Sequence, residues 1–180
     1  MERRKFIKGT LACVTGLYLG SNLAYAETFL TVDQARNVLW PHETGWKAIT
    51  LDLTREQMKS ISKASKVRVR TSRLTAWKSA SGAWFIIDQI LGKHENIDMA
   101  FAFTSEGRVK GLEVLTYRET YGDEIRNPKW RAQFHGKDKS EPLRLGGQIR
   151  NITGATLSCK HVTEGVNRLA HTWDQVLRHL

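Results

Sequence analysis

The sequence predicts an α+β fold in which a small antiparallel sheet is packed against helices. Three observations support this class. The middle of the chain holds successive short segments rich in β-branched and aromatic residues, separated by turn residues. Helical segments precede them, and a long apolar stripe with helical spacing follows them. No internal repeat or low-complexity segment interrupts this order, so we expect a single domain of residues 27–180 after a targeting segment.

The first 26 residues are typical of a secretory signal. Arg3 and Arg4 form an adjacent pair, a moderately apolar stretch follows, and small residues ending at Ala26 offer a cleavage site before Glu27. The paired arginines favour the twin-arginine type. An uncleaved anchor is the alternative, but the apolar stretch is shorter than the roughly 18–20 residues that span a bilayer. We therefore expect a periplasmic protein, exported to the outer face of the cytoplasmic membrane.

The chain is basic, with a formal net charge of +10. In an exported protein such an excess favours an acidic protein partner or peripheral contact with an anionic membrane, and not nucleic acid. The charge is densest where Lys66, Arg68 and Arg70 alternate with two valines. Alternation predicts a strand with the basic side chains on one face. That face is either a docking patch or an ordinary solvated surface.

Two short helices are expected in the first third of the mature chain. Thr31 or Asp33 lies near the cap of the first, and Thr54 with Gln57 makes a capping box for the second. Their sequence patterns cover residues 30–40 and 53–65, and a loop with Pro and Gly separates them.

Four strands should follow, joined as hairpins because the turns between them are short. Their patterns cover residues 72–79, 82–91, 97–105 and 107–117. A polar segment with one short helix beginning at Pro128 comes next. The final helix is marked by one apolar stripe. Its members are Val162, Val166, Leu169, Ala170, Trp173, Val176, Leu177 and Leu180.

The chemistry of the chain is concentrated just before this final helix, at Thr153, Gly154, Ala155 and Thr156. The glycine permits a close approach to the backbone, and the helix start offers free N–H groups to a phosphate. Each such dipole contact is worth only ~0.3–1 kcal/mol, so a covalent bond through the Thr156 hydroxyl would hold a ligand far better. The alternative is a tight turn whose threonine caps the helix.

The stretch "ITGATLS" resembles the S/T-G-A-T signature of the FMN-binding domain family, which includes the covalent-FMN domains of the sodium-pumping NADH:quinone reductase and of the Rnf complex. Two upstream stretches agree with this resemblance. "VLTYRETYGDEI" is similar to the family's strand followed by a Glu-Thr-x-Gly loop, and "KWRAQFHGK" to a later Gln-Phe and Gly-Lys segment. The matching positions are Glu119, Thr120, Gly122, Gln133, Phe134, Gly136 and Lys137. The resemblance covers roughly Ile97 to Leu169.

The resemblance implies that a flavin transferase attaches FMN to Thr156 through a phosphoester, taking FAD as donor and releasing AMP. The protein would then be an electron carrier that relays electrons between a membrane-bound redox protein or cytochrome and a further partner. The residues implied to contact the cofactor are Thr156, Thr153, Gly154, Ala155, Glu119, Thr120 and Gly122. His135 is a further candidate for positioning the flavin or a proton.

Two other functions stay open at this point. An accessory module of the same fold would hold FMN non-covalently or not at all, and Arg150 favours it because many family members carry an acidic residue there. A reductase with its own substrate would need an acid/base or nucleophile–base pair, and we identify no catalytic residue of that kind. Cys159 and His161 lack further ligands at metal-binding spacing, so we assign no metal site. Cys159, the only cysteine after the signal, is expected to be a buried thiol.

Overall fold

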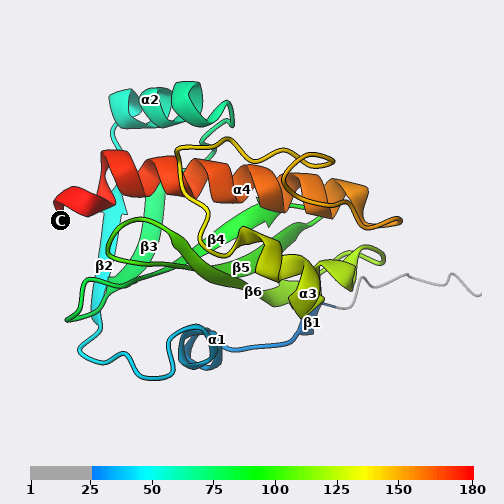
Figure 1. The fold of residues 1–180 in the computed structure, drawn as a ribbon, viewed down its shortest axis with the longest axis horizontal. Helices are drawn as coiled ribbons and strands as arrows, with labels where there is room; N and C mark the ends of the chain where they lie inside the picture. Colours follow the sequence, from blue (N-terminus) through cyan, green and yellow to red (C-terminus); the bar gives the residue numbers. More distant parts are fainter. Residues whose placement is uncertain (1–25) are drawn as a thin grey trace, which may run out of the picture.

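A computed structural model gives the fold of residues 26–180 (Figure 1). Apart from Ala26, the predicted signal lies outside the residues that the structure describes. No helix among the described residues combines the length and apolar character needed to cross a membrane. The α+β class is confirmed, because the chain forms one antiparallel sheet with helices packed on it.

The sheet has six strands in the order β1-β6-β5-β4-β3-β2, and every neighbouring pair is antiparallel. The strands are β1 (Glu27–Thr28), β2 (Lys47–Asp52), β3 (Arg73–Lys78), β4 (Trp84–Leu91), β5 (Asn96–Phe103) and β6 (Val109–Tyr117). The four predicted strands and their hairpin connections, β3 to β6, are confirmed. The sequence pattern missed β1 and β2. Both lie at the sheet edges and bury little, so their apolar pattern is weak.

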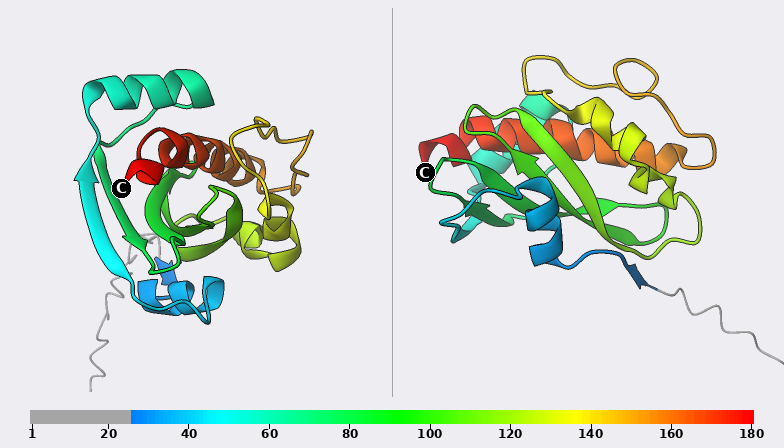
Figure 2. Two further views of the ribbon diagram at one scale, coloured as in Figure 1. Left: turned by 60° about the vertical axis from the view of Figure 1, so that its left-hand side comes forward. Right: turned by 60° about the horizontal axis from the view of Figure 1, so that its bottom comes forward.

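The helices lie on both faces of the sheet (Figures 1 and 2). They are α1 (Val32–Leu39), α2 (Arg55–Ser65), α3 (Pro128–Arg131) and α4 (Thr156–Gln175), with short 3-10 turns η1 (Asp123–Arg126), η2 (Ala132–Phe134) and η3 (Leu177–His179). The long helix α4 covers one face, α1 covers the other, and α2 packs against α4. Thr31 and Thr54 both form the capping boxes that their sequences predict, and Pro128 begins α3.

Side-chain size differs between the two faces of the central strands. On β5, the α4 face carries Met99 and Phe101, whereas the α1 face carries Ala100 and Ala102. The small residues allow α1 to approach the sheet closely, and the large ones fill the space beneath α4. The main core therefore lies between the sheet and α4.

The apolar stripe of the final helix is confirmed as the face that covers the sheet. Gly165 lies within this stripe because a Cβ there would overlap the Ile90 side chain. Its cost in helix propensity, ~1 kcal/mol relative to alanine, is offset by this close contact between helix and sheet. The stripe ends before Leu180, which is 59% exposed, because the α-helix stops at Gln175.

The basic segment is not a strand, so that prediction is wrong. Residues 66–72 form an irregular connection between α2 and β3. Lys66 takes a left-handed conformation (φ 58°) that ends α2. The backbone N–H groups of Val67 and Val69 then donate to the Ser65 and Ser62 hydroxyls of that helix. These local hydrogen bonds replace the sheet ladder that a strand would have needed.

Candidate functional site

A cavity of about 570 Å³ opens at one end of the sheet. Antiparallel order places the β4–β5 turn and the end of β6 at this same end. The first turn of α4 meets them there (Figure 1). The residues that line the cavity are Lys93, His94, Glu119, Thr120, Tyr121, Glu124, Gly154, Ala155, Thr156, Leu157 and Ser158.

The loop after β6 is fastened to the start of α4. The Tyr117 hydroxyl donates to the Tyr121 carbonyl (2.6 Å) and lies 3.1 Å from the Ser158 hydroxyl. Gly122 lies against both groups, and a Cβ at that position would come within 2.7 Å of Tyr117 and 2.8 Å of Ser158. Burial raises the pKa of Tyr117, so the phenol keeps its proton and remains a donor at neutral pH. Gly122 is thus a packing residue beneath the loop and does not itself line the cavity.

Glu119 holds the β4–β5 turn against the loop after β6. One of its carboxylate oxygens accepts hydrogen bonds from the backbone N–H groups of His94 and Glu95. Gly92 makes room for it, since a Cβ there would overlap the carboxylate. Burial by itself would raise the pKa of Glu119, but the backbone hydrogen bonds from Glu95, His94 and Lys93 outweigh it and lower the pKa. Glu119 therefore shapes the cavity as well as lining it.

We expect Glu119→Ala to lower the free energy of unfolding at neutral pH. Because the folded state lowers the pKa of Glu119, its contribution is present above the ordinary carboxylate pKa and is lost as the pH falls through the lowered value. The loss should be about 1 kcal/mol, less than the roughly 1.5–3 kcal/mol of a buried charged hydrogen bond, because the side chain is partly solvated. Urea denaturation at neutral and acidic pH measures the difference. Equal stability of both proteins at neutral pH would contradict this role, and Glu119→Gln should fall between them.

Thr156 is the first residue of α4, and its side chain is exposed beside the cavity. Ala155 occupies the cap position, and no side chain of residues 26–180 caps the helix. The interpretation of Thr156 as the helix cap is therefore wrong. Instead its hydroxyl accepts a hydrogen bond from the Asn151 side-chain amide at 2.9 Å. Gly154, with φ of 92°, makes the turn that leads into the helix.

The Gln-Phe and Gly-Lys segment supports the site from outside the cavity. The Gln133 side chain accepts from the Arg150 N–H at 2.8 Å, and the Trp130 ring N–H donates to the Arg150 carbonyl at 2.7 Å. Phe134 is fully buried, and Gly136 pairs through its backbone with the start of β6. These contacts fix the chain that leads into Thr153–Thr156.

Two further residues lie away from the cavity. His135 lines a separate depression beside Leu39 and Lys110, so it is not placed to position a ligand held at Thr156. Cys159 is completely buried behind the first turn of α4, as the sequence predicted. Burial raises the pKa of its thiol, which keeps the group protonated and unreactive at neutral pH.

The structure brings together most of the predicted contact residues. Glu119, Thr120, Gly154, Ala155 and Thr156 line the cavity, whereas Thr153 and Gly122 border it without lining it. Sequence reasoning missed Lys93 and His94 in the β4–β5 turn, as well as Glu124, Leu157 and Ser158. The predicted hairpins could have identified this turn. In successive antiparallel strands β4 and β6 run in the same direction, so the turn that follows β4 lies at the end of the sheet where β6 also ends.

A cavity of this volume is large enough for a cofactor or drug-sized ligand. Its border includes an uncapped helix start, which favours a phosphate group. These features suit a phosphate-containing cofactor. The model of the FMN-binding domain family matches residues 92–171, and this part of the chain belongs to that family. The matched region begins at the β4–β5 turn and ends within α4, so it includes every residue that lines the cavity. No curated protein matches the chain.

Proposed function

We propose that the protein is an exported flavoprotein electron carrier that holds one FMN through a phosphoester on Thr156. The observation that carries this proposal is the position of Thr156. Its hydroxyl is exposed at an uncapped helix start that borders the cavity of the FMN-binding domain. A threonine needed for the helix itself would have occupied the cap position, one residue earlier.

The surrounding residues fit FMN by their chemistry. The backbone N–H groups at the start of α4 suit its phosphate. Tyr121, which is 82% exposed, and Leu157, which is 44% exposed, offer apolar surface at the cavity to the flavin ring. Lys93 adds a cation to the lining of the cavity. When bound, FMN supplies one- and two-electron chemistry, so the protein needs no acid/base pair of its own.

The attachment step balances with FAD as the donor and a flavin transferase as the catalyst. The Thr156 oxygen forms a bond to the FMN phosphorus, the bond from that phosphorus to the AMP portion breaks, and AMP leaves. The hydroxyl proton passes to a base of the transferase. The Asn151 amide occupies a lone pair of the Thr156 oxygen and not its proton, which leaves that proton free to be removed.

The second candidate is an accessory module of the same fold that holds FMN non-covalently or not at all. The observation that favours it is Arg150, whose backbone is fixed by Trp130 and Gln133 while its side chain is exposed outside the cavity. A transferase that requires an acidic residue at this position would then fail to modify Thr156.

Intact mass and in-gel flavin fluorescence of the protein purified from its native host separate these functions. The electron carrier should show one FMN that survives denaturation, and peptide mapping should place it on Thr156. Flavin that is lost on denaturation, or a protein that carries none, would support the accessory module. A redox titration of the flavin-loaded protein would then measure whether it accepts electrons reversibly from a membrane-bound donor.

Export by the twin-arginine route is part of this proposal. Arg3 and Arg4 motivate it, together with the small residues that end at Ala26. We expect a change of both arginines to lysine to retain the precursor in the cytoplasm, because that route requires the pair. Cell fractionation and intact mass measure the result. Normal export of the double variant, with the chain beginning at Glu27, would rule out the twin-arginine route but leave the flavin assignment intact.

A further inference from the structure

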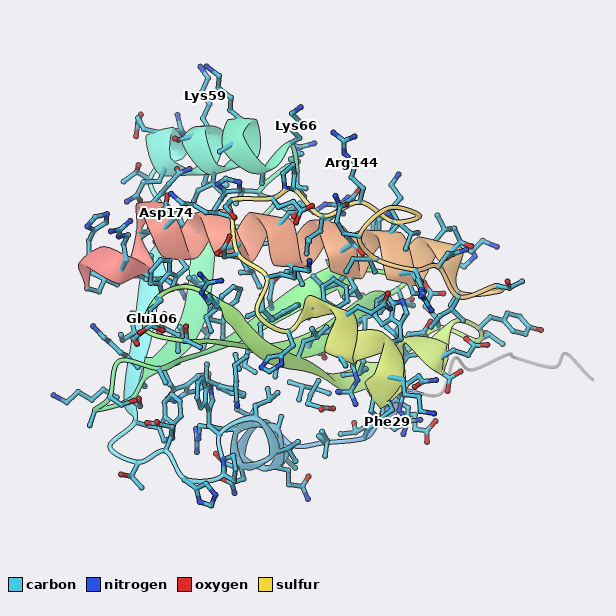
Figure 3. All side chains as sticks on the ribbon, viewed as in Figure 1. Phe29, Lys59, Lys66, Glu106, Arg144 and Asp174 are labelled. Carbon is cyan, nitrogen blue, oxygen red and sulfur yellow. The ribbon has the colours of Figure 1, made fainter. Side chains whose placement is uncertain are left out.

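A second cavity, of about 250 Å³, lies between the irregular segment after α2 and the helix α4. Segment 66–71 forms one wall with Arg68 and Arg70, and α4 forms the other with His161, Glu164 and Arg168. The end of β4 forms the floor. Figure 3 shows Lys66 at the end of α2, with its side chain directed away from α4. Lys66 also lines this wall, and the other cationic groups of the cavity are the three guanidinium groups of Arg68, Arg70 and Arg168.

Both carboxylates of the cavity have a basic partner. Asp88 forms an ion pair with Arg168, and the two side chains are only 8% and 12% exposed. Glu164 lies 3.9 Å from Lys160 on the preceding turn of α4. Arg68 and Arg70, in contrast, have no acidic partner among residues 26–180. Two uncompensated guanidinium groups thus line one wall of a concave site, where Lys66 adds a further positive charge.

The geometry of the walls prepares these charges for a ligand. The segment that carries Arg68 and Arg70 is held by hydrogen bonds from its backbone to Ser62 and Ser65, so its position does not depend on a ligand. Arg168 uses one guanidinium nitrogen for Asp88, and its other N–H groups have no protein acceptor within residues 26–180. Guanidinium groups present such donors in a planar arrangement that matches the oxygens of phosphate.

We propose that this cavity binds a dianionic phosphate monoester group. Two uncompensated guanidinium groups match a ligand with a charge of about −2 at neutral pH, as a phosphate monoester has. A single carboxylate would neutralise only half of this charge. The cavity is separate from the one at Thr156 and shares no lining residue with it. The proposal therefore does not depend on the flavin assignment. The ligand is either a soluble phosphate monoester or a lipid headgroup of the same chemistry.

Titration calorimetry with inorganic phosphate at low ionic strength tests the proposal. We expect saturable binding that is at least about tenfold weaker in Arg68→Gln/Arg70→Gln, because each lost charge-assisted hydrogen bond costs about 1.5–3 kcal/mol when fully formed and tenfold corresponds to about 1.4 kcal/mol. The matched control is Lys59→Gln/Lys63→Gln, which removes the same charge from exposed positions of α2 outside the cavity. The control should change the affinity by less than about twofold, since exposed charges act only through the screened field.

Two results would overturn the proposal. One is the absence of saturable phosphate binding, and the other is an equal loss of affinity in both double variants, which would indicate only a diffuse positive field. The titration is repeated in Thr156→Ala and in the flavin-loaded protein, so that binding at the start of α4 is recognised by its dependence on position 156.

Binding to lipid vesicles then identifies the source of the phosphate group. A preference for phosphatidic acid over phosphatidylglycerol that the arginine variant abolishes would indicate a lipid headgroup, and saturable phosphate binding without this preference would indicate a soluble monoester.

Discussion

Thr156→Ala should abolish all covalent flavin while leaving the fold intact. The hydroxyl is the only part of the residue that the attachment uses, and it is exposed at the cavity. The substitution removes one exposed hydrogen bond, from Asn151, and no helix cap. The free energy of unfolding should therefore fall by about 1 kcal/mol at most. In-gel fluorescence after denaturation measures the flavin in cells that contain the transferase, and thermal unfolding measures the stability.

Two neighbouring substitutions serve as controls for this result. Thr156→Ser keeps a hydroxyl at the start of α4 and should retain part of the flavin. Thr153 is exposed and does not line the cavity. The variant Thr153→Ala should therefore retain most of the flavin. Flavin mapped to Thr153 would overturn the assignment of Thr156. Absence of flavin from the wild type, in the presence of the transferase, would favour the accessory module and point to Arg150.

Gly122→Ala should disrupt the site through packing. A Cβ would press on the Tyr117 and Ser158 hydroxyls at 2.7 and 2.8 Å, and Gly122 has a φ of 98° that other residues rarely adopt. The backbone strain costs about 1–3 kcal/mol, and overpacking of a tight contact typically adds about 1–3 kcal/mol. The loop after β6 would move away from the start of α4. We expect a large loss of stability together with reduced flavin attachment.

Gly136→Ala provides the matched control for this prediction. Gly136 also has a positive φ, 75°, but an added Cβ would meet no atom within 4 Å, and the residue does not line the flavin cavity. Gly136→Ala should therefore lose the stability that the strained backbone costs but not the additional amount that overpacking costs. The variant should also retain its flavin. Urea denaturation and in-gel fluorescence compare the two variants. If both lose the same stability and keep the same flavin, the contact of Gly122 with Tyr117 and Ser158 has no role in the site.

The sequence alone determined the elements whose burial is strongly one-sided. The strands β3 to β6 and the stripe of α4 were predictable because large apolar residues alternate with the period of a strand or a helix. The capping boxes at Thr31 and Thr54 were predictable because they are local hydrogen bonds between residues three apart. The threonine that borders the cavity was also identified from sequence, through the resemblance of its surroundings to the FMN-binding domain family.

Only the tertiary structure decided how the site is assembled. Two hydrogen bonds of the site join residues far apart in the chain. Glu119 accepts from the backbone of His94, and the Tyr117 and Ser158 hydroxyls bond to each other. No local sequence pattern encodes such contacts. In the basic segment of residues 66–72, a local pattern was present but predicted the wrong structure. Its alternation resembles that of a strand, yet hydrogen bonds to the hydroxyls of α2 hold its backbone, and the arginines line a cavity instead of a flat face. Alternation with a period of two shows which side chains lie on the same face. A strand also needs a neighbouring strand to pair with its backbone, and the rest of the fold determines whether one is present.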